Sequence, residues 1–418
     1  MKKGLILYLG VVLVFTLTAE ARKTDPRTNL VTKEGETTVI KASGAKLPGV
    51  GTIVSTTGYG DAWRATAGMT GKSIIVDSTG TNIGIGFGKA ASPCNLVFSY
   101  SNDFGANWGT QTIADSMNTR CYNGLALDNS GRPYIVWQDR NTNTIFWSRD
   151  EGGIGGGLWT PPDTLSSDSV AWYLPTMAIR DSILIISALA HAVAGGDYST
   201  YYALSYDLGA TWVYSGWDKF CDNEISGLGW DVDPVDWLIS GSGDTVVAFL
   251  EVVGDTVSYV AESGYAGFFP AYKVSVDSGR TFGPMQMFNP YPQYWYGGWW
   301  YMYDGAWIND RPYFLFTWQD GTWNGQGLFV YFPTTAGDFS AWTVKRISGI
   351  PGNLAGVTPG DLNGGGVNFP TLSSDAAGNI YAIYNDYGKT TNNDEIFGVA
   401  SVDSGKTWLN PVQLTNEA

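Results

Sequence analysis

The stretch SYDLGATW, Ser205 to Trp212, decides the fold of this chain because it belongs to a series. Ser, Asp, Gly and an aromatic residue recur at relative positions 0, 2, 4 and 7 along the 418 residues. The other copies are SNDFGANW from Ser101, SVDSGRTF from Ser275, SVDSGKTW from Ser401 and SRDEGG from Ser148, which delays its aromatic to Trp159. A motif that returns in this way indicates a repeat architecture.

A second pattern precedes the copies and predicts a further hairpin. In ALDNSGRPYIVWQD, offsets 0, 3, 6, 9 and 11 hold Asp128, Gly131, Tyr134, Trp137 and Asp139. The stretch SSDAAGNIYAIYND repeats those offsets from Asp375. Aromatic and β-branched residues on either side of an Asp/Gly turn are typical of two antiparallel strands. Two successive hairpins make a four-stranded antiparallel unit, which is the form of a propeller blade.

The spacing of the copies predicts the number of blades. Ser275 and Ser401 lie 126 residues apart, about two units, and TTAGDFSAW from Thr334 is a decayed copy between them. Six units result, starting near residues 66, 121, 173, 228, 303 and 366. We therefore predict an all-β fold, a six-bladed β-propeller of four-stranded antiparallel blades, over residues 66–418. Residues 22–65 lie outside it and offer a strand to close the ring.

Residues 1–21 predict a secretory signal peptide. Lys2 and Lys3 precede an apolar run, and Ala19-Glu20-Ala21 offers small residues for cleavage. We expect the mature chain to be secreted, or held at the cell surface or in the periplasm, without a membrane span. We also expect a monomer or, since the chain stops just after the last hairpin, part of a larger exported chain.

Charge and cysteine content narrow the function classes. The formal charge is −15, and loss of Lys2, Lys3 and Glu20 with the signal makes it −16. An acidic surface repels phosphate backbones, so we expect no nucleic-acid partner. Three cysteines allow at most one disulfide within the chain, and spacing leaves a Cys94–Cys121 bridge open beside Cys221.

The Ser-Asp-Gly pattern fits a hairpin turn better than a catalytic site. Ser and Asp oxygens can accept the N–H groups of a turn, Gly permits a positive φ, and the aromatic ring can pack beneath. A catalytic Asp is needed once or twice, whereas this one recurs, so we predict structural roles for Asp103, Asp150, Asp207, Asp277 and Asp403. We expect no cofactor. A structural calcium ion is conceivable, but each copy supplies few oxygen ligands.

The four near-complete copies resemble the Asp-box, S-x-D-x-G-x-x-W, which is the repeat of bacterial neuraminidases. With two degraded copies, the resemblance covers roughly residues 66–415. It implies a six-bladed β-propeller of the sialidase-like superfamily, whose boxes lie at the periphery and away from the site. Asp-boxes also occur in proteins that are not sialidases or not enzymes, so the fold alone does not set the function.

Blade topology predicts a site near the axis, on the face opposite the boxes. Turns after the second and fourth strands lie there, and such central depressions bind ligands. Alignment at the end of the second strand gives Gly88 in the first unit and five ionisable residues in the others: Asp139, His191, Glu251, Asp320 and Asp386. The three Asp residues close similar sequences, WQD, WQD and YND, so turn capping is their alternative role. His191 and Glu251 depart from the repeat and are the stronger candidates.

The resemblance implies particular roles for residues of this face. A sialidase grips the substrate carboxylate with arginines, protonates the leaving oxygen and uses a Glu-activated Tyr as nucleophile. Glu251 would activate the Tyr and Asp139 would be the general acid, with His191 as a further catalytic candidate. Substrate-binding candidates are Arg64, Arg120, Arg140, Asp320 and Asp386. The family's Arg-Ile-Pro signature is absent, with AWRATAG around Arg64 nearest to it, and a ring of acids repels an anionic sugar. A neutral-glycan hydrolase or lyase therefore stays open.

Two segments near the fourth unit are unusual in composition. More than half of YPQYWYGGWWYMYDGAW, residues 291–307, is Trp or Tyr. Such rings can stack on sugars, which makes Trp299 and Trp300 candidates for substrate binding, and packing of the loop on the propeller is the alternative. Upstream, WDVDPVDW gathers Asp231, Asp233 and Asp236, which we interpret as solvated turn residues rather than a cation site.

Three interpretations of the function follow from these observations. The first is a secreted, sialidase-like propeller, an exo-sialidase or related glycoside hydrolase, that acts on an extracellular glycan or glycoprotein. The second is a non-catalytic surface or adhesion module that binds a glycan or a protein with the same face. A purely structural repeat within a larger exported protein is a third.

Overall fold

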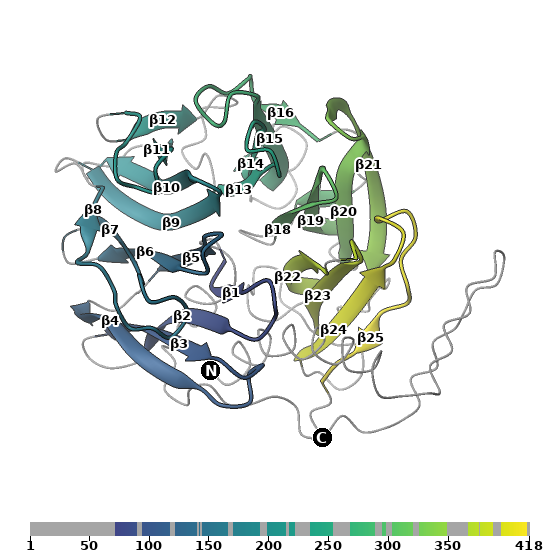
Figure 1. The fold of residues 1–418 in the computed structure, drawn as a ribbon. Helices are drawn as coiled ribbons and strands as arrows, with labels where there is room; N and C mark the ends of the chain where they lie inside the picture. The colour runs from purple at the N-terminus through teal and green to yellow at the C-terminus, as the bar shows by residue number, and fades with distance from the viewer. Residues whose placement is uncertain are drawn as a thin grey trace.

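The computed structural model describes residues 72–89, 94–117, 122–139, 142, 144–165, 170–192, 199–214, 217–221, 235–253, 268–288, 295–297, 303–320, 326–348, 367–375, 377–387 and 394–415. Within these ranges the chain forms 25 β-strands, arranged as six blades around a central axis (Figure 1). The predicted six-bladed β-propeller is confirmed. A search of the same ranges for a helix long and apolar enough to cross a membrane finds none. The predicted signal peptide and residues 22–65 lie outside the described part of the chain.

Each blade is an antiparallel sheet of four strands that follow one another in chain order from the axis outward. Blade 1 contains β1 (Ile74–Val76), β2 (Ile83–Lys89), β3 (Cys94–Ser101) and β4 (Gly109–Met117). Blade 2 contains β5 (Asn123–Leu127), β6 (Pro133–Asp139), β7 (Thr144–Arg149) and β8 (Asp163–Thr164). Blade 3 contains β9 (Val170–Arg180), β10 (Ile183–Ala192), β11 (Ser199–Ser205) and β12 (Asp218–Cys221).

The last three blades repeat this order. Blade 4 contains β13 (Asp236–Ile239), β14 (Val246–Val253), β15 (Phe268–Ser275) and β16 (Gln286–Met287). Blade 5 contains β18 (Tyr303–Ile308), β19 (Arg311–Asp320), β20 (Gln326–Thr335) and β21 (Asp338–Ser348). Blade 6 contains β22 (Val367–Ser374), β23 (Ile380–Tyr387), β24 (Asp394–Ser401) and β25 (Val412–Gln413). A short extra strand, β17 (Trp295–Gly297), pairs with β15 and β19 and so links blades 4 and 5.

The core lies between neighbouring blades, because each sheet is covered on both faces. In β6, Tyr134 and Val136 pack toward blade 3, whereas Ile135 and Trp137 pack toward blade 1. All four side chains are buried. Successive residues of a strand point to opposite faces, so a strand covered on both faces is apolar throughout. A charged residue within such a strand therefore needs a separate explanation.

Blade topology gives the propeller two distinct ends. The chain runs along the innermost strand of each blade, turns, and returns along the second strand. The start of each innermost strand and the end of each second strand thus lie together, and we call this side the loop end. In blade 4, for example, Asp236 at the start of β13 pairs with Phe249 of β14. The turns between the first two strands, and those between the last two, lie at the opposite side, which we call the turn end.

Candidate functional site

The repeated Ser-Asp-Gly motifs form hydrogen-bonded turns at the turn end. Ser205 Oγ donates to Asp207 Oδ1 over 2.7 Å and accepts the N–H of Gly209 over 2.8 Å. Asp207 also accepts the N–H and the hydroxyl of Thr211, both over 2.7 Å. Leu208 and Gly209 have positive φ angles of 57° and 91°, and the N–H of Ala210 bonds to the carbonyl of Asp207. Two central residues with positive φ define a type I′ turn. The predicted hairpin turn, with a structural role for its Asp, is confirmed.

The copies that begin at Ser101, Ser275 and Ser401 repeat these bonds, and their aspartates share one electrostatic consequence. Hydrogen bonds to the carboxylates hold the pKa values of the motif aspartates below the usual range, to about 2 for Asp207 and Asp277. The pKa is also lowered at Asp103 and at Asp403, where the hydrogen bonds outweigh partial burial. These carboxylates are ionised and committed to turn donors, which excludes them as proton donors near neutral pH.

The turns of blades 3, 4 and 6 also contact the blade before them, which the sequence did not predict. A Cβ atom on Gly209 of blade 3 would lie 2.5 Å from Cη2 of Trp147 in blade 2. The hydroxyl of Tyr214 in blade 3 donates to the carbonyl of Arg280 in blade 4 over 2.6 Å. Tyr313 of blade 5 likewise donates to the carbonyl of Ser404 in blade 6 over 3.0 Å. The motif is thus a joint between blades and not only a self-contained turn.

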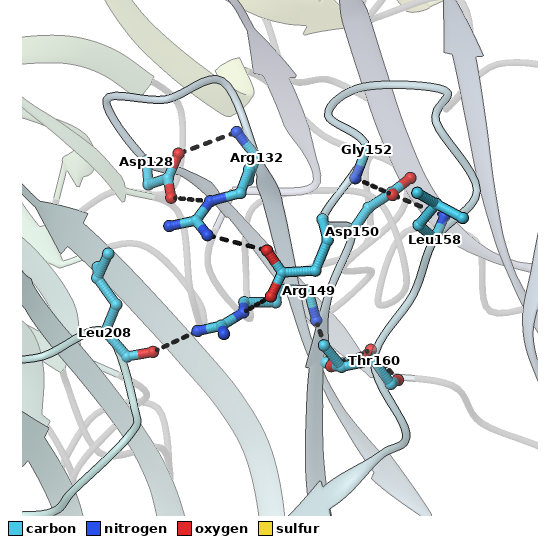
Figure 2. Close-up of polar contacts among 10 residues, drawn as sticks. Asp128, Arg132, Arg149, Asp150, Gly152, Leu158, Thr160 and Leu208 are labelled. Carbon is cyan, nitrogen blue, oxygen red and sulfur yellow. Dashed lines mark hydrogen bonds and ion pairs between the residues drawn. The ribbon is translucent and has the colours of Figure 1, made fainter.

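The degenerate copy in blade 2 keeps Ser148 and Asp150 but delays its aromatic to Trp159, and its longer turn is held by the buried Asp150 carboxylate and an ion-pair network (Figure 2). Asp150 is fully buried and accepts the N–H groups of Gly152, Gly157 and Leu158 over 2.7 to 2.9 Å. Arg149 donates to Glu151 over 2.6 Å and to the carbonyl of Leu208 in blade 3 over 3.2 Å (Figure 2). The turn end is therefore occupied by structural contacts.

The structure places the predicted rim residues at the loop end of their blades. Asp139 ends β6, Asp320 ends β19, and His191, Glu251 and Asp386 lie in the last residues of β10, β14 and β23. Asp139 Oδ2 accepts the hydroxyl of Thr142 over 3.1 Å, which is the turn capping that the sequence left open. For the other four only the backbone is described, so their roles stay predictions. Further candidates outside the described residues are Arg64, Arg120, Arg140, Trp299 and Trp300, together with Cys121, Asp231 and Asp233.

A polar cluster that the sequence did not identify lies at the loop end of the axis. We call it the axial cluster, and its members are Lys72, Asp236, Asp304 and Gly305. Lys72 lies two residues before β1, Asp236 begins β13, and the other two belong to β18. Lys72 Nζ donates to the carbonyl of Gly305 over 2.9 Å, across the axis from blade 1 to blade 5. Asp236 Oδ2 would lie 3.1 Å from a Cβ atom on Gly305.

Hydrogen bonds extend from the axial cluster to the remaining blades. Asp304 Oδ2 accepts the N–H of Leu372 over 2.7 Å and the hydroxyl of Thr371 over 3.0 Å, both from β22 of blade 6. The carbonyl of Lys72 accepts the N–H of Leu125 in blade 2 over 2.6 Å. The carbonyl of Val235, next to Asp236, accepts the hydroxyl of Thr176 in blade 3 over 2.7 Å. All six blades thus meet at or beside this cluster.

The two carboxyls of the axial cluster have unlike surroundings. Burial, together with the charge of Asp304, raises the pKa of Asp236 to about 7. Lys72 and the backbone N–H groups of Gly305 and Trp237 lower it without cancelling the effect of burial. Asp236 Oδ2 is inaccessible to solvent and has no hydrogen-bond partner among the described residues. Asp236 and Asp304 nevertheless keep some exposed surface. Asp236 is therefore suited to hold a proton near neutral pH, whereas Asp304 accepts two hydrogen bonds.

The interpretation of Asp236 as a solvated turn residue was wrong. Asp236 begins an innermost strand, where β9 and β18 flank it and burial follows from the fold. A sequence signal did exist, because Asp236 and Asp304 each interrupt apolar stretches, PVDWLI and MYDGAWI. A charge inside an innermost strand faces the axis or a neighbouring blade and so requires a partner.

The described residues contain no group of three or more His, Cys, Asp or Glu side chains that could hold a metal ion. The carboxylates of the turn end donate none of their oxygens to a shared centre, because hydrogen bonds from turn N–H and hydroxyl groups occupy them. The axial cluster itself offers two carboxyl groups and one ammonium group.

Comparison with known proteins gives a likeness in fold. No protein-family model matches the chain, and no curated protein does. An α-L-arabinofuranosidase from Fusarium graminearum is 12% identical with a TM-score of 0.48, over 78% of this chain and 91% of that chain. An α-L-arabinanase from Penicillium chrysogenum is 12% identical with a TM-score of 0.46, over 77% and 89%. The NanB sialidase from Streptococcus pneumoniae is 9% identical with a TM-score of 0.46, over 79% and 68%.

All three are glycoside hydrolases. At these identities the likeness concerns the fold alone, and a fold hosts many functions. The residues of the axial cluster must therefore carry any statement about chemistry.

Proposed function

We propose that the protein is an exported glycoside hydrolase that acts on extracellular glycans at the loop end of its axis. The observation that carries the proposal is the pair of carboxyls, Asp236 and Asp304, on neighbouring innermost strands in unlike surroundings. Glycoside hydrolysis uses two carboxyl groups, one to protonate the leaving oxygen and one to act as base or nucleophile. Environments that separate the pKa values of two such groups assign these roles.

Asp236 suits the role of general acid. Burial raises its pKa toward neutrality, so that the carboxyl keeps its proton at the pH where many hydrolases work. As the bond between the anomeric carbon and the glycosidic oxygen breaks, Asp236 would give this proton to the departing oxygen. Asp236 keeps some exposed surface, and a substrate would reach it from the loop end.

Asp304 suits the complementary role. Leu372 and Thr371 fix the position of its carboxylate from blade 6. It would take a proton from the attacking water, or attack the anomeric carbon itself before water releases the sugar. In either course the hydroxyl of water ends on the anomeric carbon. In the first course Asp236 ends ionised and Asp304 protonated, and proton exchange with solvent restores both. In the second course the ionised Asp236 takes the proton of the attacking water and is itself restored.

Exo-sialidase activity is the narrower form of the proposal. It requires a cationic site for the carboxylate of the sugar, for which Arg64, Arg120 and Arg140 are the candidates. Glu251, Asp139 and His191 would then line the rim around the axial cluster, and Trp299 and Trp300 would stack on the sugar. The same loop end would serve the non-catalytic adhesion module that is the alternative function.

Hydrolysis of a panel of fluorogenic glycosides tests the proposal. The panel would include an α-sialoside, an α-L-arabinofuranoside and neutral pyranosides. We expect turnover of at least one substrate, with kcat about 100-fold lower in Asp236→Asn and in Asp304→Asn. Wild-type kcat should fall as pH rises above about 7, because Asp236 then loses its proton. The fall should be absent from the residual activity of Asp236→Asn.

Asp77→Asn is the matched control, because Asp77 stands at the turn end of blade 1 and binds Thr79 and Asn82. It should retain full kcat. If the folded protein cleaves no member of the panel yet binds glycans on an array, the hydrolase proposal is wrong and the adhesion module is favoured. Turnover that survives both axial substitutions would instead move the reaction away from the axial cluster.

A further inference from the structure

Lys72 is held at both ends, which is unusual for a long and flexible side chain. Its carbonyl accepts the N–H of Leu125 over 2.6 Å, and the carbonyl of Ser73 accepts the N–H of Gly86 over 3.0 Å. These bonds fix the backbone against blade 2 and within blade 1. The ammonium group donates to the carbonyl of Gly305, 233 residues later in the chain. Fixing a lysine costs side-chain entropy, so the arrangement needs a compensating interaction.

Gly305 is a common neighbour of this ammonium group and of the Asp236 carboxyl. The carbonyl of Gly305 accepts from Lys72 Nζ, while Asp236 Oδ2 would lie 3.1 Å from a Cβ atom at the same residue. Phe314 and Leu238 close the same space at 3.0 and 3.1 Å. The absence of a side chain at position 305 thus allows the carboxyl to lie against the backbone that also receives Lys72.

Two charged groups face Asp236 among the described residues, namely Lys72 and Asp304. Asp304 is bound to β22 and adds negative charge, whereas Lys72 supplies the positive charge. Without Lys72 the axial cluster would consist of two carboxyls in a partly buried space. Opposite charges favour the ionised form of a buried acid, and like charges oppose it.

We infer that Lys72, held across the axis on the carbonyl of Gly305, is a positioning residue that sets the charge state of the Asp236 carboxyl. The inference is independent of turnover, although its consequence for hydrolysis rests on the proposed function. Lys72 keeps Asp236 close to the balance between its acid and its carboxylate. The residue comes from the first blade, so the acid of blade 4 acquires its working state only when the first blade has met blades 4 and 5 at the axis.

The unfolding free energy as a function of pH tests this directly. Urea unfolding from pH 4 to 9 would be measured for each protein and for its Asp236→Asn counterpart. The difference between the two curves follows the titration of Asp236, since only that group differs. The variants are Lys72→Met, Lys72→Gln, which keeps an N–H donor for Gly305 without the charge, and Lys72→Arg, which keeps the charge.

We expect the midpoint of the Asp236 titration to rise by about one pH unit in Lys72→Met and in Lys72→Gln. Lys72→Arg should leave it near the wild-type value. A general loss of stability moves both curves of a pair and leaves the midpoint unchanged, so a structural role alone gives no shift. Equal midpoints in the wild type and both uncharged variants would overturn the inference, and if Lys72→Met does not fold, Lys72→Gln decides.

The pH profile of kcat supplies the second readout. If the protein hydrolyses a glycoside, the fall in kcat at high pH should move upward in Lys72→Gln by the same amount as the Asp236 titration. A protein without turnover would contradict the proposed function and leave the stability titration interpretable. Conversely, turnover with an unmoved profile and an unmoved titration would contradict only the role of Lys72.

Discussion

The turn end and the loop end of the propeller hold their carboxyls in opposite ways. At the turn end, Asp207 and Asp277 each accept several hydrogen bonds at the surface, and these lower the pKa to about 2. At the loop end, Asp236 is withdrawn from water beside a second carboxyl, and its pKa is raised. Aspartate thus serves as an ionised, structural hydrogen-bond acceptor at the turn end and as a carboxyl that can hold a proton at the loop end.

The aspartates of the turn end therefore serve stability, whereas those of the loop end are suited to chemistry, and the two groups affect stability in opposite ways as pH changes. A lowered pKa contributes stability that is present above the unfolded value of about 3.8 and is lost as pH falls. A raised pKa does the reverse, because its contribution is complete at low pH and is lost as pH rises through the folded value. The aspartates of the turn end therefore stabilise the fold near neutral pH, whereas the buried Asp236 at the loop end destabilises it there.

The largest effect on stability should come from the joint between blades 2 and 3. Gly209→Ala forces a Cβ atom to 2.5 Å from Trp147 and keeps a φ of 91°. Overpacking of a ring adds to the cost of a left-handed alanine, so we expect a loss of about 3 kcal/mol in the free energy of unfolding. Urea denaturation measures it.

Gly80→Ala is the matched control for this substitution. Gly80 has a φ of 76° in the turn between β1 and β2, but a Cβ atom there meets nothing within 4 Å. It should cost about 1 kcal/mol, which isolates the backbone term. Equal losses in the two variants would show that the turns do not fasten neighbouring blades, and the turn end would then be a row of independent hairpins.

The second effect concerns the loop end and has the opposite sign. Asp236→Asn removes a carboxyl whose pKa is raised by burial, so it should stabilise the protein above pH 7, by about 2 kcal/mol. The gain should shrink as pH falls and vanish below about pH 3, where Asp236 is protonated in both states. Unfolding curves in urea at pH 5 and pH 8 give the comparison.

Asp304→Asn provides the contrast within the axial cluster. Asp304 accepts two hydrogen bonds from blade 6, so its replacement should destabilise the protein at pH 8. A loss of stability in both variants would mean that Asp236 is a structural anchor like the aspartates of the turn end. The distinction between the two ends would then fail.

The sequence predicts the fold well where its interactions are local. The Ser-Asp-Gly turn closes its hydrogen bonds within eight residues, for example from Ser205 to Thr211, so its copies are visible as a motif and their number gives the blades. The link through β17 was not predictable, because Phe268, Gly297 and Trp318 pair only after two blades have formed.

The candidate site was predictable only in part. Topology alone placed Asp139 and Asp320 at the end opposite the turns, since every second strand finishes there. Lys72, Asp236 and Gly305 meet across separations of up to 233 residues, and no spacing in the sequence records such a meeting. The available signal was the charged residue that interrupts an apolar innermost strand, but we interpreted Asp236 as a solvated turn residue.

A third test uses pH at the turn end. Asp207→Asn should reduce the loss of stability on acidification, because the wild type must protonate a carboxylate that Ser205 and Thr211 hold ionised. The urea midpoint of the wild type should therefore fall more steeply between pH 4 and pH 2 than that of the variant. Asp244→Asn, in the exposed turn between β13 and β14, is the control and should leave the slope as it is. Parallel slopes for the wild type and Asp207→Asn would show that the lowered pKa of Asp207 does not contribute to stability at the turn end.

The smallest effect should come from the ion pairs of blade 2, although they are conspicuous in the structure (Figure 2). Glu151 binds Arg132 over 2.9 Å and Arg149 over 2.6 Å, but its side chain is 38% exposed. Glu151→Gln should therefore cost about 0.5 kcal/mol, and less in 1 M NaCl because salt screens exposed pairs. Asp150→Asn, one residue earlier, should cost about 2 kcal/mol, because a buried acceptor of three backbone N–H groups is altered. A larger loss in Glu151→Gln than in Asp150→Asn would mean that the turn end depends on long-range charge rather than on its hydrogen-bonded turns.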